Sequence, residues 1–369
     1  MNKIRKVAEQ FVSSGNVVNV DEFGNGNIND TYLVHVDDQG IENFILQQIN
    51  TYVFPRPKLI IHNLRTFTEH VNQRLKNGGF NLNRRWDVPK ILPTRAGADF
   101  YVDAQDSFWR AISFVKHSHS YDTVQSMDHA RETGYALGLF HNLVSDLDSK
   151  RMHDTLVGYH IAPQYLQQYD HAAASQTRIN DSPLVRYCHQ SIRERRDLTS
   201  ILEDAKKQGH LKTHIIHGDT KVNNILFCDK TDQAISFIDL DTVKPGLIHY
   251  DIGDCLRANC NPLGEETTDF DNVHFETPLA RSILEGYFAN AGTFLTENDY
   301  AFIFDAVRLL TFEQGLRFFA DYLAGDIYFK VKHAEHNLER AVVQFKLTES
   351  IEAQEKELRS IIADLKPSG

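Results

Sequence analysis

The segment from His217 to Asn224 has residue types at a spacing that suits general-base and metal chemistry. It forms an H-x-D-x-x-x-x-N pattern, with Asp219 third and Asn224 last, and it directly follows the apolar pair Ile215 and Ile216. A carboxylate in a loop after a strand can accept a proton from a hydroxyl group, and a nearby amide oxygen can bind a hard divalent cation. The pattern alone also arises by chance, so its surroundings have to support that chemistry.

A predicted hairpin brings a second carboxylate to the same place. Asn224 begins one apolar segment, the polar residues 228–233 form a turn, and Asp239 ends the next apolar segment. Because antiparallel pairing places the first residue of one strand beside the last residue of the other, Asn224 and Asp239 should lie together. Asp219 lies in the loop that leads to them. The three oxygen-bearing side chains are therefore expected to converge.

This combination suits a magnesium-nucleotide site. Mg²⁺ prefers oxygen ligands and leaves its remaining positions to water and to phosphate oxygens. In protein kinases a loop aspartate takes the proton of the substrate hydroxyl, while an asparagine and a later aspartate hold the metal ions. We therefore predict an ATP- and Mg²⁺-dependent kinase in which Asp219 is the catalytic base and Asn224 and Asp239 are the metal ligands.

Each of these residues also has a purely structural interpretation. Asp219 suits a turn, Asn224 a cap and Asp239 a charge at a strand end; their joint occurrence favours the functional interpretation. Two further acidic features support it, because carboxylates close to apolar runs need a partner or an ion. They are Asp241, two positions after Asp239, and the two aspartates of the segment 250–254.

Other candidate motifs are weaker. The Gly24 to Asn27 turn is able to present backbone N–H groups to phosphates, but Gly-Asn turns are typical of ordinary hairpins. His117 and His119 lie on a polar run with no acidic or Cys partner at metal spacing, which predicts a solvated linker. We expect His217 to orient its loop by hydrogen bonding. No serine lies in a G-x-S-x-G motif, so a serine hydrolase has no support.

The elements needed to position these residues form two groups. The first part of the chain alternates and turns as strands do, with one helical segment at 58–75 that ends at Asn77, Gly78 and Gly79. After Val115 helical periodicity dominates, beginning with 126–143. The predicted strands are 17–23, 31–36, 43–49, 88–92, 100–102, 109–115, 214–217, 224–227 and 234–240. We therefore predict a strand-rich lobe at 1–115 and a mainly helical lobe at 116–369.

Composition restricts the class of protein. The 369 residues are 41% hydrophobic and 24% charged, which is typical of a globular chain with room for two lobes. The net charge of −11 disfavours nucleic-acid and anionic-membrane partners. Four cysteines without paired spacing favour a reducing compartment, and the first residues lack the apolar core of a secretory signal. No apolar run is long enough to cross a membrane. We predict a cytoplasmic protein.

The motifs as a set resemble the aminoglycoside phosphotransferase superfamily, and within it the N-acetylhexosamine 1-kinases. The resemblance spans nearly the whole chain. The segments that carry it are 26–34, 45–50, 219–226, 238–242 and 317–323.

This resemblance implies an α+β, two-lobed protein-kinase-like fold, with a small mixed-sheet N-lobe, a larger mainly helical C-lobe and ATP between them. It implies transfer of the γ-phosphoryl group to the anomeric hydroxyl of N-acetylglucosamine or N-acetylgalactosamine, in a monomer or small homo-oligomer. The positions expected at the nucleotide are Gly26, Asn27, Ile28, Gln47 and Val115. The positions expected at the sugar or the transferred phosphate are Asn29, Lys221, Asp241, Arg317 and Tyr328.

Two of these positions leave alternatives open. Gln47 stands where many kinases have a strand lysine that pairs with phosphates, so a non-catalytic nucleotide-binding protein is one alternative, unless Lys221 supplies the charge. Arg317 lies off the apolar face of the helix expected at 309–323, where a solvated charge is the ordinary interpretation. A kinase acting on another sugar, an aminoglycoside or a choline-like alcohol is a further alternative, although Lys221 and Arg317 disfavour a polycationic acceptor. The preferred acceptor and the choice between ATP and GTP stay open.

Overall fold

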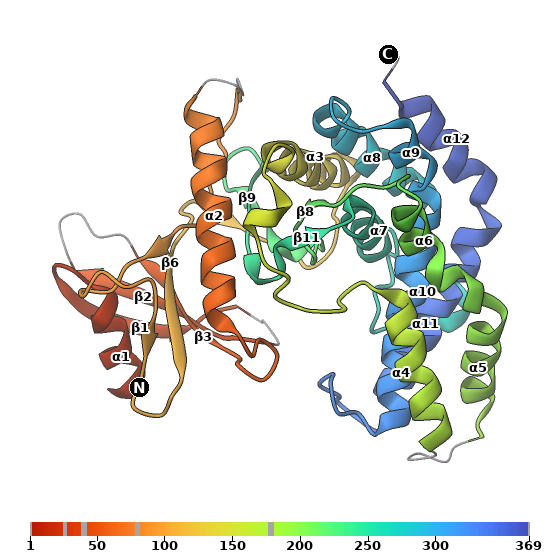
Figure 1. Cartoon of the computed structure of the whole chain (residues 1–369), viewed down its shortest axis with the longest axis horizontal. Coiled ribbons are helices and arrows are strands. Elements are labelled where there is room, and N and C mark those ends of the chain that lie inside the picture. The colour runs from red at the N-terminus through yellow and green to blue at the C-terminus, as the bar shows by residue number, and fades with distance from the viewer. Residues whose placement is uncertain (1, 25–27, 38–42, 78–81, 176–180, 368–369) are drawn as a thin grey trace.

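A computed structural model of the chain describes residues 2–24, 28–37, 43–77, 82–175 and 181–367. Figure 1 shows two parts, a sheet with few helices and a larger bundle of helices, with helix α2 standing between them. We call residues up to 113 the sheet part and the residues after them the helical part. The helical part is built around buried aliphatic and aromatic side chains drawn from many elements. The expected α+β two-lobed arrangement is present, and the boundary at 115/116 stays a prediction.

The sheet part contains one antiparallel sheet in the order β1-β2-β3-β6-β4, with β5 paired to β6. Its central strand β3 is buried on both faces at Phe44, Ile45 and Leu46, and Trp109 and Ala111 of β6 are buried beside it. Apolar side chains covered on both sides explain why this pair forms the centre. The strands are β1 (Asn16–Glu22), β2 (Asp30–Asp37), β3 (Phe44–Ile49), β4 (Ile91–Leu92), β5 (Tyr101–Val102) and β6 (Phe108–Ser113).

Three predicted strands lose two or more residues at one end. The strand at 88–92 keeps only Ile91–Leu92, because Pro89 and Pro93 flank it and proline cannot donate to a ladder. The strand at 109–115 ends at Ser113. The strand at 234–240 ends at Phe237, and a 3-10 turn at Leu240–Thr242 follows. This early end releases Asp239 from the sheet.

Helix α2 (Pro57–Lys76) packs against the helical part as well as the sheet part. Phe67 stacks on Phe140 with ring centroids 5.2 Å apart. Asn63 donates from Nδ2 to the carbonyl oxygen of Val243 over 2.9 Å. Helix α1 (Asn2–Ala8) packs against the antiparallel sheet of the sheet part through Val7 and Ala8. Helix α2 therefore joins the two parts through buried contacts.

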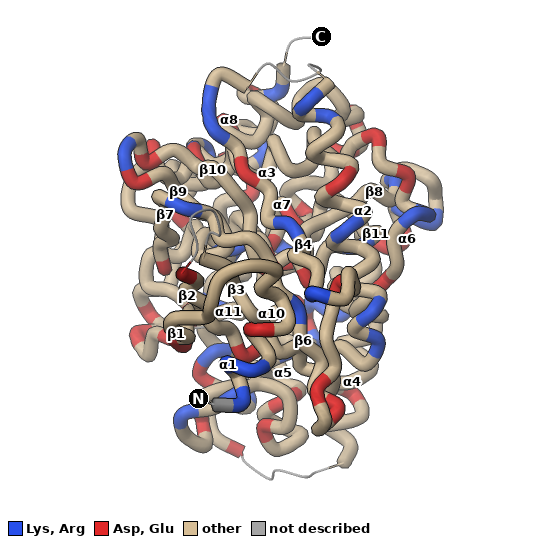
Figure 2. The backbone as a smooth tube through the Cα atoms, turned by 90° about the vertical axis from the view of Figure 1, so that its left-hand side faces the viewer, with Lys and Arg blue, Asp and Glu red and all other residues tan. Residues whose placement is uncertain are grey.

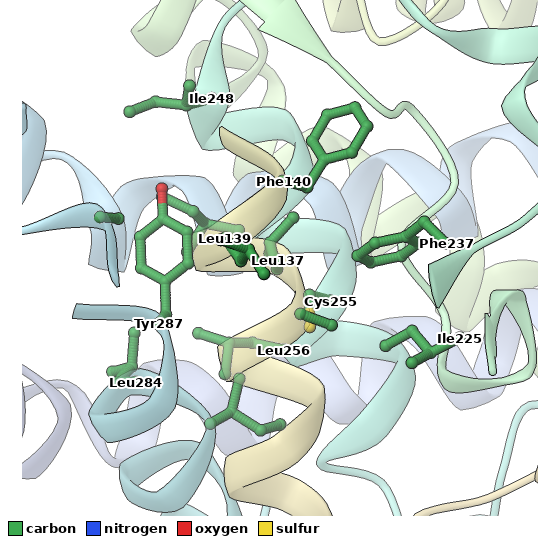
Figure 3. Close-up of a cluster of buried hydrophobic side chains, with 14 of the residues drawn as sticks. Leu137, Leu139, Phe140, Ile225, Phe237, Ile248, Cys255, Leu256, Leu284 and Tyr287 are labelled. Atoms are coloured by element: carbon green, nitrogen blue, oxygen red, sulfur yellow. The ribbon is translucent and has the colours of Figure 1, made fainter. Parts of the chain in front are cut away.

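The helical part is centred on α3 (Met127–Val144), α7 (Ile248–Asn259) and α8 (Thr277–Ala291), whose side chains pack together in Figure 3. Helices α3 and α8 approach so closely that a Cβ at Gly138 would lie 2.4 Å from the carbonyl oxygen of Tyr287. The other helices are α4 (Ala162–Ser175), α5 (Pro183–Arg195), α6 (Ile201–Lys207), α9 (Glu297–Ala301), α10 (Ile303–Ala324), α11 (His336–Ala353) and α12 (Glu355–Leu365). These closely packed helices support the loops that contact α7.

Two short sheets lie against these helices. One consists of β7 (Ser118–His119), β9 (Ile225–Cys228) and β10 (Ala234–Phe237) in the order β10-β9-β7, and the other pairs β8 (His214–Ile216) with β11 (Lys244–Gly246). Nδ1 of His119 lies 2.9 Å from Oδ1 of Asp229, an acidic partner that lies outside the local sequence spacing. The two residues are distant in sequence and meet only through the β7–β9 pairing.

Lys and Arg residues are interspersed with Asp and Glu residues over the face shown in Figure 2. Within the described ranges, no helix combines the length and apolar character that a membrane span requires.

Candidate active site

Side chains of helix α7 hold the loop at residues 217–224 through hydrogen bonds to its backbone. Asp251 accepts hydrogen bonds from the backbone N–H groups of His217 and Gly218 over 2.6 and 2.8 Å. Asp254 and Asn259 accept from the N–H groups of Thr220 and Val222, each over 3.3 Å. Positions 254 and 259 lie three and eight residues after 251 on α7, and all three side chains reach the loop. Helix α7 therefore fixes the backbone of this loop.

Asp251 is the centre of a buried polar network. Its Oδ2 also lies 2.9 Å from Nε2 of His141, whose Nδ1 lies 2.9 Å from the hydroxyl of Tyr287. The side chain of Asp251 is fully buried. A buried carboxylate is costly unless its oxygens are hydrogen-bonded, and here backbone and side-chain donors satisfy both of them.

His217 connects the 217–224 loop to the strand that leads to Asp239. Its Nδ1 accepts from the N–H of Asp219 over 3.2 Å, and its Nε2 donates to the carbonyl oxygen of Ile238 over 3.0 Å. Burial lowers the pKa of His217, which agrees with a neutral ring that uses one nitrogen as acceptor and the other as donor. The expected orienting role fits this geometry.

Asp219 lies half-buried within reach of two side chains from the same loop. Asn224 donates from Nδ2 to Oδ2 of Asp219 over 2.8 Å and to its carbonyl oxygen over 2.9 Å. Nζ of Lys221 lies 3.1 Å from the same Oδ2. Asp219 engages the amide nitrogen of Asn224, and within the described ranges the amide oxygen accepts no hydrogen bond and is left for another partner.

Asp239 follows the early end of β10 and has left-handed backbone geometry, with φ of 57°. The N–H of Ile238 donates to the carbonyl oxygen of Asn224 over 2.9 Å, so the hairpin places Asn224 and Asp239 beside each other as predicted. Non-glycine residues rarely adopt this geometry, and aspartate tolerates it better than most.

The carboxylate of Asp239 is open to solvent, yet protein surrounds it on its other sides. This burial and the neighbouring carboxylates of Asp241 and Asp219 raise the pKa of Asp239 to about 7, while Lys221 and Arg110 lower it. In the part of the chain that the structure describes, this carboxylate accepts no hydrogen bond.

These features fit a divalent cation. A carboxylate without a donor, an amide oxygen and an excess of negative over positive side chains are the properties that Mg²⁺ requires. The described ranges contain no group of three or more His, Cys, Asp or Glu residues that could hold a metal by themselves. A cation here would therefore complete its coordination with Asn224 and with oxygens of water or phosphate.

Asp241 is held by residues of the sheet part. Its Oδ2 accepts from Nδ2 of Asn29 over 2.6 Å, and the guanidinium of Arg110 forms an ion pair with its Oδ1. Oε1 of Gln47 accepts from Nε and Nη2 of Arg110 over 3.0 and 2.7 Å. The structure thus brings the predicted residues Asn29, Gln47 and Asp241 together and adds Arg110.

Arg317 is not a solvated charge. Its guanidinium carbon lies 5.2, 5.0 and 5.4 Å from the ring centroids of Tyr159, Tyr165 and Phe329, and Nη1 donates to Oε1 of Gln314 over 2.9 Å. Such cation–π contacts stabilise a partly buried arginine.

The ring of Tyr159 relates Arg317 to the 217–224 loop. Burial raises the pKa of Tyr159, the charge of Arg317 opposes this rise and the charge of Asp219 adds to it. Both charges therefore lie near Tyr159. The exposed Tyr328 packs edge-on against Phe329, with centroids 4.9 Å apart. Arg317 and Tyr328 thus belong to one cluster through Phe329, and Tyr159 brings this cluster near Asp219.

The remaining predicted nucleotide positions are less well defined. Gly26 and Asn27 lie outside the described residues. Ile28 is exposed, and its carbonyl oxygen accepts from Nδ2 of Asn50 over 3.3 Å. Val115 is buried in the segment that leaves the sheet, and its carbonyl oxygen accepts from Oγ of Ser118 over 2.8 Å. Roles at a nucleotide stay predictions for all of them.

Two important residues were missed from the sequence. Asp251 was noted only as part of an acidic segment. Arg110 carried a recognisable signal, because it stands among Phe108, Trp109 and Ala111 in a strand that is otherwise apolar. A charged residue inside such a strand needs a buried partner.

Comparison with known proteins identifies the family of this chain. Residues 19–289 match the phosphotransferase enzyme family. The chain belongs to this family. The match confirms the superfamily inferred from the motifs.

Solved structures of related fold cover almost the whole chain. An aminoglycoside phosphotransferase from Alicyclobacillus acidocaldarius subsp. acidocaldarius DSM 446 has a TM-score of 0.64 and 14% identity, covering 98% of this chain and 96% of that one. A choline kinase from Cryptosporidium parvum Iowa II has a TM-score of 0.59 and 13% identity, covering 99% and 98%. A microcompartment-associated aminopropanol kinase has a TM-score of 0.57 and 15% identity, covering 97% and 98%. At these identities the likeness shows the fold, which is the two-lobed kinase-like one.

Proposed function

We propose that this phosphotransferase is an ATP- and Mg²⁺-dependent kinase that phosphorylates the anomeric hydroxyl of N-acetylglucosamine or N-acetylgalactosamine. The observation that carries the proposal is the half-buried carboxylate of Asp219, contacted by Asn224 and Lys221, beside the unbonded carboxylate of Asp239. A proton acceptor and metal-ligand oxygens at one place are what phosphoryl transfer to a hydroxyl requires.

In the proposed reaction Asp219 accepts the proton of the sugar hydroxyl as its oxygen forms a bond to the γ-phosphorus and the bond to the ADP oxygen breaks. Bound Mg²⁺ would neutralise charge on the phosphate oxygens. Asn224 keeps Oδ2 of Asp219 oriented through its amide nitrogen and offers its amide oxygen to the metal together with Asp239. Lys221 places a positive charge beside Asp219, where negative charge develops on the transferred group.

The aromatic cluster around Arg317 supports a neutral sugar as the acceptor. Aromatic boxes bind quaternary ammonium groups, but here Tyr159, Tyr165 and Phe329 surround the protein's own guanidinium. A choline-like or polycationic acceptor would therefore meet a positive charge. A neutral sugar with hydroxyl and carbonyl oxygens would instead find donors in Arg317 and in the hydroxyl of Tyr328.

The non-catalytic alternative rests on Gln47. In its place on the sheet, Gln47 binds a buried arginine, so a positive charge is present although the lysine is not. Together with Asp219, Asn224 and Asp239 this favours an active enzyme.

An ATP-consumption screen over neutral sugars, amino sugars, aminoglycosides and choline, with and without Mg²⁺, tests the proposal. We expect Mg²⁺-dependent turnover that is fastest with the two N-acetylhexosamines. Turnover only with a cationic acceptor would overturn the substrate assignment, and absence of turnover with every acceptor would favour the non-catalytic alternative. The same screen with GTP decides the nucleotide preference.

A further inference from the structure

Arg110 is a buried charge in the middle of the sheet. It lies on β6 directly opposite Gln47 of β3 in the antiparallel register. Its side chain is only 2% exposed, and so is that of its ion-pair partner Asp241. A guanidinium in such a place needs partners that satisfy its charge and its donors.

The neighbouring strands supply the hydrogen-bond partners that hold Arg110. Gln47 accepts two hydrogen bonds from the guanidinium with Oε1, while Nε2 of Gln47 donates to Oγ1 of Thr31 over 3.1 Å. A lysine at position 47 would place a second cation against Arg110 and would remove this acceptor. A neutral acceptor at position 47 therefore suits the presence of Arg110.

The guanidinium meets the helical part at Asp241. The other oxygen of Asp241 accepts from Asn29, and Oδ1 of Asn29 in turn accepts from the N–H of Asn50 over 2.9 Å. Two side chains of the sheet part thus hold both oxygens of one carboxylate. Asp241 belongs to the short loop at 239–242 that begins with the left-handed residue Asp239.

We propose that Arg110 is a positioning residue that fastens the 239–242 loop, and with it the metal ligand Asp239, to the nucleotide-binding sheet. Arg110, held by Gln47, is thus the buried cation of this part of the sheet, where many kinases instead carry a strand lysine that pairs with phosphates. In this arrangement Asp241 serves first as the anchor of that loop, with both oxygens engaged. The inference rests on the proposed function only in taking Asp239 as the metal ligand, and it does not depend on the sugar.

Calorimetric titration with ADP tests this role, with Mg²⁺ and with EDTA, on Arg110→Gln, Arg110→Lys and Gln47→Lys. The matched control is Arg195→Gln, which removes another partly buried arginine–carboxylate pair, with Glu352, between α5 and α11. We expect Arg110→Gln to weaken MgADP binding by about 10- to 100-fold, the usual effect of losing a group that orients a metal ligand. ADP binding in EDTA should change much less, and Arg110→Lys should regain part of the loss.

Gln47→Lys is the most discriminating variant. We expect it to weaken MgADP binding although it restores the residue common in kinases. Tighter MgADP binding in Gln47→Lys, or an unchanged MgADP affinity in Arg110→Gln, would overturn the proposal. If Arg110→Gln does not fold, the double variant Arg110→Gln/Asp241→Asn removes both charges, so that no unpaired buried charge remains. Wild-type MgADP affinity in that double variant would also overturn it.

Hydrogen exchange of the backbone amides at 239–243 separates this inference from the proposed function. We expect faster exchange in Arg110→Gln than in Arg195→Gln, measured without any ligand. If wild type binds ADP equally with Mg²⁺ and EDTA, the metal site of the proposed function is wrong, and exchange alone then decides whether Arg110 fastens the loop. Equal exchange in the two variants would contradict the fastening itself.

Discussion

The two loops that meet at the candidate site are held from opposite sides. The 217–224 loop, which contains Asp219, is hydrogen-bonded to buried side chains of α7 within the helical part. The 239–242 loop, with Asp239, is tied by Asn29 and Arg110 to the sheet part. The position of the proposed base therefore depends on one part of the molecule, whereas the position of the proposed metal ligand depends on both.

This difference shows that proton acceptance by Asp219 and metal binding by Asp239 can be impaired separately. A change beneath the 217–224 loop should cost stability of the helical part together with catalysis. A change around the 239–242 loop should instead alter how the protein responds to metal and nucleotide.

Asp251→Asn should have the largest effect. The amide keeps one acceptor and turns a donor toward buried N–H groups, so we expect a loss of about 3 to 5 kcal/mol of unfolding free energy. Urea unfolding followed by circular dichroism measures it. The exposed Asp271→Asn should change stability by less than about 0.5 kcal/mol. A comparable small loss in both variants would show that α7 does not carry the loop.

Asp239→Ala should remove the stabilisation by MgADP and leave the unliganded fold intact. In wild type, ligand at 100 times its dissociation constant adds about 2.7 kcal/mol of apparent stability. Thermal shift with MgADP against ADP in EDTA measures this difference. Asp232→Ala is a matched control, because Asp232 is also left-handed, with φ of 55°, at the other end of the same hairpin. An undiminished shift in Asp239→Ala would place the metal elsewhere.

Arg317→Ala changes neither loop and should affect the sugar alone. Loss of a charged hydrogen bond of about 2 kcal/mol lowers kcat/KM for the sugar by roughly 10- to 100-fold. The KM for ATP should hardly change. Arg359→Ala, which removes another arginine stacked on an aromatic ring, serves as the control. Unaltered sugar kinetics in Arg317→Ala would exclude Arg317 from the acceptor site.

The pH response of the 239–242 loop should be the smallest effect. Burial and neighbouring carboxylates raise the pKa of Asp239 to about 7. Without metal, protonation of this carboxyl group therefore stabilises the folded state fully below about pH 4, and this stabilisation is lost as the pH rises through about 7. Metal binding needs the ionised carboxylate and should weaken below pH 7 by up to about 1.4 kcal/mol per pH unit. Calorimetry with MgADP at pH 6, 7 and 8 tests this; equal affinity at pH 6 and 8 would contradict it.

Local patterns made much of this arrangement predictable. The spacing from His217 to Asn224 and the hairpin after it correctly predicted that Asn224 and Asp239 lie together, since a short turn fixes antiparallel register. Helix α3 was predicted within a residue at each end, where Ser126 caps its start.

The contacts that hold the site could not be predicted in the same way. Asn29 and Asp241 are separated by 212 positions, and no periodicity in the sequence indicates which distant side chains will share a hydrogen bond. The aromatic surroundings of Arg317 come from two distant segments, 159–165 and the one around Phe329, so its helix face alone suggested a solvated charge. Long-range packing decides such contacts, and the sequence pattern reports only local structure.

Single-turnover kinetics with wild type and Asp219→Asn tests the central claim most directly. MgATP and N-acetylglucosamine or N-acetylgalactosamine are mixed with excess enzyme, and the product is identified by ³¹P NMR. We predict a sugar 1-phosphate with wild type and a rate about 10²- to 10⁴-fold lower with Asp219→Asn, at unchanged MgADP affinity. A variant rate within a few-fold of wild type, or phosphate at a hydroxyl other than the anomeric one, would contradict the account.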